Sequence, residues 1–277
     1  MPDELMSRGE IEALARELLS ASETGKMVAG APSVRGGFDL STAYEVEATL
    51  KRIREAGGHR AVGRKVGYAN KAMWRVLKLE TLVWAHMYDD TVHYSDNNSS
   101  ELILAHPRSL KIEPEIIFGV KQAIGEGLDA VAALASADWL ALGFEIIDCP
   151  FPEWKFQPSD FVASFGLHAA LVIGEKIQVR PDLIATLVEE LPRFKVRMLK
   201  NGEFVEEGAG RNSLKSPALC LAELGAAIAR RFPAEPLSAG EIVSSGTLTA
   251  GHATGKGDLW TVEVEGLALP SLTLRLA

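Results

Sequence analysis

Two long apolar segments predict neighbouring strands, and each strand has acidic side chains on a face that is otherwise buried. In Leu110–Val120 the side chains alternate between two faces, so Glu113 and Glu115 project together while the apolar residues pack on the other side. In Trp139–Ile147 the large apolar residues form one face, and the other face presents small residues followed by Glu145. A charged residue in an otherwise buried strand needs a partner. We therefore expect the three acids to converge.

Oxygen ligands from three acids favour a cation site. Like charges held close together repel one another, and a divalent cation supplies the opposite charge. An isolated Glu-x-Glu pair is more often a solvated strand face, but Glu145 on a second strand favours the metal. Pro114, between the two other acids, requires an edge strand or a bulge. A carboxylate-only set suits Mg²⁺ or Mn²⁺ better than zinc, so we expect Glu113, Glu115 and Glu145 to hold one of these ions.

Other patterns along the chain predict an α+β fold. The strongest local signal is Asn201-Gly202, which favours a type I′ turn between strands at 194–200 and 203–207. A helix capped by Ser41 or Thr42 should end at Gly57. The remaining expected elements are helices at 11–19, 71–79, 128–137 and 217–231, and strands at 61–68, 241–249, 259–265 and 271–276. Because the helix at 128–137 lies between two strands, we expect a β-α-β unit.

Composition excludes several classes of partner. The formal charge of −8, with no run of Lys and Arg, argues against nucleic acid and against anionic membranes. Cys149 and Cys220 lie in apolar stretches and predict buried thiols. Met1–Ser20 has no apolar block of signal-peptide length, and no segment reaches the ~18 uncharged apolar residues of a membrane span. These features predict a cytoplasmic protein.

No long linker divides the 277 residues. We expect one continuous body, in which residues 1–60 form a small helical N-terminal subdomain and residues 61–277 form a β-rich, metal-binding catalytic domain. Lys65 lies in a Gly-flanked strand of that domain. A lysine there is an anion clamp or proton carrier, or else an exposed strand residue that reaches water.

A series of motifs in a fixed order resembles a known family. The motifs are Gly63–Gly67, Tyr88–Asp90, Ile112–Ile116, Gly143–Asp148, Trp154 with Asp160, Gly208–Pro217 and Gly240–Thr249. Together they resemble the 2-keto-4-pentenoate hydratase and 4-oxalocrotonate decarboxylase branch of the fumarylacetoacetate hydrolase superfamily. The resemblance covers about residues 38 to 277, and it implies a mixed β-roll core and assembly as a homo-oligomer.

This resemblance also implies a chemistry. It places Mg²⁺ or Mn²⁺ on the three glutamates, where the carboxylate and 2-oxo oxygen of a small-molecule 2-oxo acid chelate the ion. Lys65 lies beside them as a catalytic residue, and Gly246 and Thr247 form a turn that binds substrate. A metal on the 2-oxo oxygen stabilises the enolate that forms when a proton moves, water adds or CO₂ leaves.

Two departures from the family pattern affect the acid and base groups. Val83 stands where the hydratases have an acidic residue, and the segment Ala163–His168 differs from the usual Ala-Asp-Asn-Ala-Ser. His86 and His168 are candidate replacements, because imidazole titrates near neutral pH. We assign His168 as the second catalytic residue. A lone histidine in an apolar run is, however, more often a hydrogen-bonded core residue.

Three functions remain open at this point. The first is a metal-dependent lyase, a hydratase or decarboxylase, that acts on a 2-hydroxy-2,4-dienoate or 2-oxo-alkenoate in the catabolism of aromatic compounds. The second is an acylpyruvate-type C–C hydrolase of the same superfamily. The third is a non-catalytic protein that binds a metal and an oxo acid, which the loss of the acid at Val83 favours.

Overall fold

The computed structural model describes residues 6–277. The helices are α1 (Arg8–Thr24), α2 (Leu40–Ala56), α3 (Lys71–Leu77), α4 (Ala130–Ala135), α5 (Pro158–Ala163), α6 (Ile184–Glu190) and α7 (Pro217–Arg231). Short 3₁₀ turns are η1 (Pro32–Val34), η2 (Pro152–Trp154), η3 (Phe165–Leu167), η4 (Pro181–Leu183) and η5 (Gly210–Asn212). The strands are β1 (Ala61–Gly67), β2 (Val83–Tyr88), β3 (Val92–Tyr94), β4 (Ser99–Leu102), β5 (Leu110–Val120), β6 (Ala137–Asp148), β7 (His168–Ile173), β8 (Ile177–Gln178), β9 (Lys195–Lys200), β10 (Glu203–Ala209), β11 (Ile242–Thr247), β12 (His252–Thr254), β13 (Leu259–Glu265) and β14 (Leu272–Leu276).

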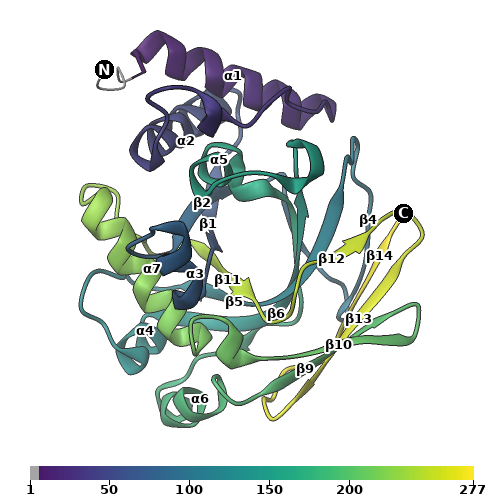
Figure 1. Ribbon diagram of the computed structural model, residues 1–277. Helices are drawn as coiled ribbons and strands as arrows, with labels where there is room; N and C mark the ends of the chain where they lie inside the picture. Colours follow the sequence, from purple (N-terminus) through teal and green to yellow (C-terminus); the bar gives the residue numbers. More distant parts are fainter. Residues whose placement is uncertain (1–5) are drawn as a thin grey trace.

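The larger sheet curls into a roll. Within residues 6–277 it has nine strands in the order β2-β1-β11-β5-β6-β7-β3, with β12 on β5 and β8 on β6. Its end strands β2 and β3 follow each other in the chain, and the turn at Asp89–Thr91 joins them, so the sheet bends round until its ends meet (Figure 1). The pairs β1–β11 and β3–β7 are parallel, whereas β5 is antiparallel to both β11 and β6. The predicted α+β fold with a mixed β-roll is confirmed.

The smaller sheet lies against the outside of the roll. Its strands run in the order β10-β9-β13-β14-β4. Asn201 and Gly202 have φ angles of 54° and 83°, as a type I′ turn requires, so the predicted hairpin is confirmed. Buried Met198 and Leu272 of this sheet share a core with Phe144 on the outward face of β6.

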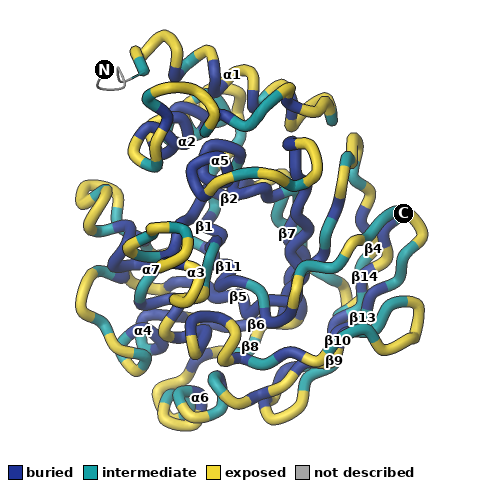
Figure 2. The backbone as a smooth tube through the Cα atoms, in the orientation of Figure 1, coloured by how far each residue is buried: buried dark blue, intermediate teal, exposed yellow. Residues whose placement is uncertain are grey.

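Alternation along the strands separates two apolar cores. The large core lies outside the roll, between the sheets and the helices, and includes Ile116 and Phe118 of β5. A second, smaller core is formed by residues whose side chains point into the roll: Met87, Ile117, Trp139, Ala141, Leu171, Ile173 and Ile242. Figure 2 shows the roll strands buried along most of their length. Because Ile117 shares a face with Glu115, the inner core closes the roll next to the acids.

Helices α1 and α2 lie together at one end of the molecule, and α2 packs on α5 and β2 (Figure 1). Two hydrogen bonds connect the segment between α1 and α2 to α5. The Asp160 carboxylate accepts from the Ser33 N–H (2.6 Å) and from the Ser33 hydroxyl (2.6 Å). The division at residue 60 stays a prediction, and residues 1–5 of the predicted subdomain lie outside the described part of the chain.

Two local predictions are wrong. Strands β5 and β6 are antiparallel neighbours, with Leu110 opposite Asp148, so α4 lies in the connection of an antiparallel pair and not in a β-α-β crossover. Helix α2 is capped by Asp39, whose side chain accepts from the Thr42 N–H (2.8 Å), and not by Ser41 or Thr42. Cys149 and Cys220 are buried free thiols, as expected.

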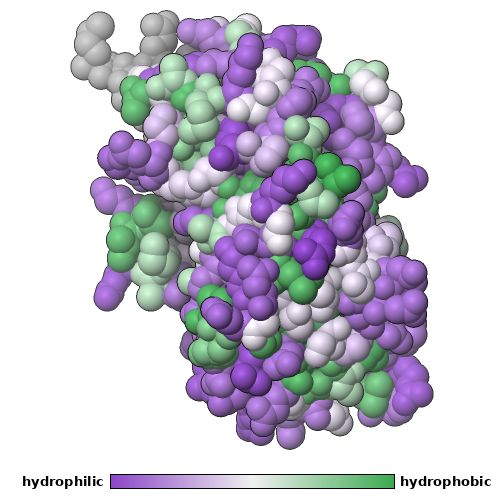
Figure 3. Space-filling view, turned by 90° about the vertical axis from the view of Figure 1, so that its right-hand side faces the viewer, coloured by the Kyte–Doolittle hydropathy of each residue, from purple (hydrophilic) through white to green (hydrophobic). Residues whose placement is uncertain are grey.

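One face of the molecule carries hydrophobic residues in small separate groups among hydrophilic ones (Figure 3). No helix in the described range 6–277 has both the length and the apolar character that crossing a membrane requires.

Candidate metal centre

Strand register brings the three glutamates together. In the β5–β6 pair Glu113 lies opposite Glu145, and Glu115 lies opposite Gly143. Carboxylate oxygens of Glu113, Glu115 and Glu145 all lie within 4.8 Å of one another. Glu115 and Glu145 are buried, and Glu113 is partly exposed. The predicted convergence is therefore seen in the structure.

Pro114 was expected to lie on an edge strand or at a bulge, and it lies at a bulge. Strand β5 is not an edge strand, but the β5–β11 register shifts between Ser244 and Thr247, next to Pro114. After this irregularity the Leu248 N–H donates to the Pro114 carbonyl (2.9 Å). The proline thus lies at a bulge, where one ladder bond is already missing.

The β11 bulge supplies donors to Glu115. Its Oε2 accepts from the Ser244 hydroxyl (2.6 Å) and from the Gly246 N–H (2.7 Å), while its Oε1 has no hydrogen-bond partner among the described residues. Gly246 has a φ of 90°, and a Cβ there would lie 2.7 Å from the Ala69 Cβ, so only glycine fits. Gly251 packs similarly close to Glu113, whose Oε1 would lie 2.8 Å from an added Cβ.

Lys65 is buried beside Glu145. Its ammonium group lies 3.1 Å from Glu145 Oε2 and donates to the Gly166 carbonyl (2.9 Å), and it lies 4.7 Å from the Phe161 ring centroid. The side chain is only 2% exposed, so the alternative of an exposed strand lysine is wrong. The three carboxylates thus outnumber the buried ammonium group beside them.

This surplus of negative charge is reflected in the pKa values. Loss of solvent raises the pKa of Glu113 to about 7, and the Glu145 charge adds to the shift against the opposing pull of Lys65. Burial, followed by the charges of Glu145 and Glu113, raises the pKa of Glu115 well above its usual value. Burial would also raise the pKa of Glu145, but Lys65 and His168 outweigh it and hold that pKa below its usual value. Three ionised carboxylates here require a cation.

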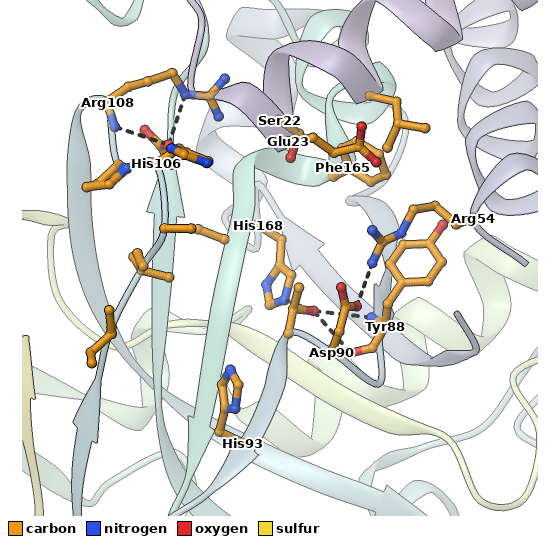
Figure 4. A pocket seen from close by; sticks show the side chains of 18 of the residues that line it. Ser22, Glu23, Arg54, Tyr88, Asp90, His93, His106, Arg108, Phe165 and His168 are labelled. Carbon is orange, nitrogen blue, oxygen red and sulfur yellow. Dashed lines mark hydrogen bonds and ion pairs between the residues drawn. The ribbon is translucent and has the colours of Figure 1, made fainter. Parts of the chain in front are cut away.

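His168 lies behind Glu145. Its Nδ1 donates to Glu145 Oε1 (2.9 Å), and its Nε2 pairs with the Thr91 hydroxyl (3.0 Å). The imidazole lines a separate cavity of about 340 Å³, which it shares with Arg54, Tyr88 and others (Figure 4). This lining has no residue in common with that of the cavity over the glutamates. The geometry supports a role in positioning Glu145, and the predicted catalytic role of His168 stays a prediction.

His86 does not approach the glutamates. It projects from β2 toward α2, where its Nδ1 and its backbone N–H both contact the Glu47 carboxylate. Val83, at the position of the expected acid, is buried, with 1% of its surface exposed. The structure therefore brings Lys65 to the site and leaves His86 outside it.

A cavity of about 490 Å³ opens over the glutamates. Its lining includes Lys65, Glu113, Glu115, Gly246 and Thr247, so the two residues of the predicted substrate turn face the same space as the acids. The lining also includes residues that the sequence analysis did not single out for the site, among them Lys111, Phe156, Phe161 and Asn212. Lys111 shares a strand face with the two acids of β5, and the same alternation identifies it.

The donor set suits a hard divalent cation. Each of the three glutamates offers a carboxylate oxygen, and Glu115 Oε1 lacks any other partner within residues 6–277. Oxygen-only sets of this kind bind Mg²⁺, Mn²⁺ or Ca²⁺. A cation held by these residues would offset the repulsion among the acids.

Nearly the whole chain is similar in sequence to named hydratases and decarboxylases. No family model matches the chain. A 2-hydroxyhexa-2,4-dienoate hydratase of Comamonas testosteroni is 27% identical over 263 residues, covering 95% of this chain and 96% of the relative. A 4-oxalocrotonate decarboxylase of Pseudomonas sp. (strain CF600) is 29% identical over 263 residues, again covering 95% of this chain and 96% of the relative.

Solved structures share the fold. The 4-oxalocrotonate decarboxylase of Pseudomonas putida G7, complexed with magnesium and adipate, matches with a TM-score of 0.85 and 26% identity over 99% of this chain and 100% of that chain. The fumarylpyruvate hydrolase of Pseudomonas aeruginosa, in complex with Mn²⁺ and pyruvate, matches with a TM-score of 0.56 and 17% identity over 78% of this chain and 89% of that chain. The second likeness is one of fold alone.

The curled mixed sheet of this chain is the fold that both solved structures share. Over nearly its whole length the chain is similar to 2-keto-4-pentenoate hydratases and 4-oxalocrotonate decarboxylases, the branch that its motifs resemble.

Proposed function

We propose that this protein is a divalent-metal-dependent lyase, a hydratase or decarboxylase, that acts on a 2-hydroxy-2,4-dienoate or 2-oxo-alkenoate in the catabolism of aromatic compounds. The observation that carries the proposal is the cluster of Glu113, Glu115 and Glu145, whose carboxylate oxygens lie within 4.8 Å of one another beside an open cavity. Relatives over nearly the whole chain bear the names of such hydratases and decarboxylases.

The proposed ion is Mg²⁺ or Mn²⁺, held by the three glutamates. Solved relatives were crystallised with magnesium, calcium or manganese. When bound, such an ion polarises the 2-oxo oxygen of the substrate and stabilises negative charge that develops on it. A 2-oxo acid in the cavity lined by Glu113 and Glu115 could supply its carboxylate and oxo oxygens to such an ion.

Lys65 is proposed to hold the reacting end of the substrate. Its ammonium group is fixed by Glu145 and by the Gly166 carbonyl, so it needs little reorganisation to pair with an anionic oxygen. Burial makes that pairing stronger than it would be in water. Phe161 lies against the lysine and limits water at this point.

His168 is proposed to orient Glu145. A carboxylate held at one oxygen by an imidazole presents its other oxygen in a fixed direction. The Thr91 hydroxyl in turn holds the imidazole ring. This role needs no contact between His168 and the substrate.

Buried Val83 favours a second candidate function, a protein that binds a metal and an oxo acid without turnover. In this fold the expected acid would project from the start of β2, and valine cannot transfer a proton.

An absorbance assay separates the functions. The purified protein is mixed with Mg²⁺ and, in separate reactions, with 2-hydroxypenta-2,4-dienoate, 4-oxalocrotonate or an acylpyruvate. We expect loss of ultraviolet absorbance with a dienoate or with 4-oxalocrotonate, abolished by EDTA and by Glu113→Gln. Loss with the acylpyruvate alone would favour the hydrolase, and binding without any loss would favour the non-catalytic protein. Sedimentation of the same sample tests the predicted homo-oligomer.

A further inference from the structure

A second cavity lies on the far side of His168 from the three glutamates. Its volume is about 340 Å³, and it is lined by parts of α1, α2, β2, β3 and β7 together with residues 103–108. None of its lining residues also lines the cavity over the glutamates. Figure 4 shows Arg54, Tyr88 and Asp90 on one side of this space, and His106 and Arg108 on the other. The proposed function gives the cavity no role.

Arg54 has donors that the protein does not use. Its guanidinium group carries five N–H groups, and the described residues accept only one hydrogen bond from it, at the Asp90 carboxylate (2.5 Å). The guanidinium carbon lies 4.6 Å from the Tyr88 ring centroid, so the group packs against that ring. The Tyr88 hydroxyl is buried and also has no hydrogen-bond partner within residues 6–277. This side of the cavity therefore has donor capacity to spare.

Two imidazoles add further capacity. His93 and His106 both line the cavity, and neither forms a side-chain hydrogen bond with any residue in the described range. A neutral imidazole has one N–H to donate and one nitrogen that accepts. Both rings can therefore pair with a polar group that enters the cavity.

The carboxylates of the lining are, by contrast, largely occupied. Asp90 is paired with Arg54, and Asp148 accepts from the Arg108 Nε–H (2.9 Å). Glu23 lies on the exposed last turn of α1, where water solvates it. The unused hydrogen-bonding capacity is thus mainly that of donors, which suits a ligand group that only accepts, such as a carboxylate.

The rest of the lining is apolar. Leu19, Leu104, Pro107, Phe165 and Ala169 all line the cavity. A bare inorganic anion would leave these side chains in water, whereas an organic body would bury them. A cavity of roughly 150 Å³ is enough for a benzene ring. The space therefore accommodates a ligand with a single ring or a short branched chain beside its carboxylate.

We propose that this cavity is a second ligand site, which binds a small organic monocarboxylate. Arg54 and His93 donate to the carboxylate, and Leu19, Leu104 and Phe165 cover the apolar body. The inference does not rest on the proposed function, because no residue of this site lines the cavity over the glutamates.

Two probes of the same shape test the proposal. Titrations followed by ¹⁹F nuclear magnetic resonance give the Kd of 4-fluorobenzoate and of 4-fluorobenzamide, which differ in charge. The samples contain EDTA, so that no metal ion can hold a carboxylate at the three glutamates. We expect 4-fluorobenzoate to bind roughly tenfold more tightly than the amide, as one charge-assisted hydrogen bond provides.

Variants locate the probe. Arg54→Met should reduce the ratio of the two Kd values to about one. His93→Leu should weaken 4-fluorobenzoate several-fold, and it keeps the test valid if Arg54→Met fails to fold, because His93 makes no side-chain hydrogen bond that folding would lose. Lys176→Met is the matched control. It removes a positive charge that lies over the rings of Tyr94 (4.2 Å) and Trp139 (4.5 Å), outside this cavity, and should leave the ratio at its wild-type value.

Three results would overturn the proposal. They are the absence of binding for both probes, equal affinity of the wild-type protein for the acid and the amide, and binding that Lys111→Met abolishes while His93→Leu leaves it unchanged. The last result would place the probe in the cavity over the glutamates, which Lys111 lines. All three leave the proposed function standing, because no metal ion is present in these samples.

Discussion

Replacing Glu115 by glutamine should stabilise the metal-free protein and remove most of its stabilisation by Mg²⁺. The three carboxylates have oxygens within 4.8 Å of one another, and two unit charges at that separation repel by roughly 3.5 kcal/mol at an effective dielectric constant of about 20. A glutamine oxygen can still accept from Ser244 and Gly246, which hold Glu115 at 2.6 and 2.7 Å. The substitution therefore removes repulsion and keeps both hydrogen bonds.

The net gain is smaller than the full repulsion. Burial and the neighbouring charges raise the pKa of Glu115. The wild-type carboxyl group therefore relieves part of the charge repulsion by taking up a proton. We expect Glu115→Gln to gain about 1–2 kcal/mol without metal, which corresponds to a rise in Tm of roughly 2–5 °C in EDTA. Mg²⁺ at a hundred times the wild-type Kd should stabilise the wild-type protein by about 2.7 kcal/mol. A hundredfold weaker site leaves roughly 0.4 kcal/mol.

Thermal melts in EDTA and in Mg²⁺ measure both effects. Glu101→Gln removes an exposed acid on β4 and is the matched control, with a Tm expected to follow the wild-type value in both buffers. If Glu115→Gln melts below the wild-type protein in EDTA, or keeps the full rise with Mg²⁺, the reasoning about charge repulsion and metal binding is refuted.

Three further predictions concern the surroundings of the site. His168→Gln should weaken Mg²⁺ binding by roughly ten- to a hundredfold in calorimetry, because Glu145 loses its orienting partner; an unchanged Kd would contradict the positioning role. Folding raises the pKa of Glu113 from 4.5 to about 7. In EDTA, the stability that this shift contributes is therefore present below about pH 4.5 and is lost as the pH rises through 7. Urea unfolding should show this decline in the free energy of unfolding, and saturating Mg²⁺ should remove it. Asp160→Asn should cost about 1–2 kcal/mol in urea unfolding, because Ser33 loses a charged acceptor, with no change in Mg²⁺ affinity.

Alternation along a strand was sufficient to predict the cluster of three glutamates. Glu113 and Glu115 had to share a face, and Glu145 stood alone among small residues in a buried strand, so their convergence needed only that the two strands pair. The same rule places Lys111 on that face of β5. The assignment of the three acids as ligands is a proposal that rests on this geometry.

Features that depend on tertiary packing were not predicted. Strand β2 is buried along its whole length, so Val83–Tyr88 shows no alternation that would mark it as a strand. The direction of His168 depends on a register shift between Ile146 and Ile147 in the β6–β7 pair, which turns the imidazole toward Glu145 and the second cavity. Asp39 and Thr42 are both good caps, and only the path of the preceding loop decides between them.

Electron paramagnetic resonance of Mn²⁺ with ¹⁷O-labelled oxalate tests the central claim most directly, since oxalate presents the same pair of oxygens as a 2-oxo acid. We predict one Mn²⁺ per chain, with lines that broaden when ¹⁷O replaces ¹⁶O in the oxalate, and loss of the bound Mn²⁺ signal in Glu145→Gln. Unbroadened lines, or a full Mn²⁺ signal in that variant, would show that the ion is held elsewhere or that the oxo acid does not reach it.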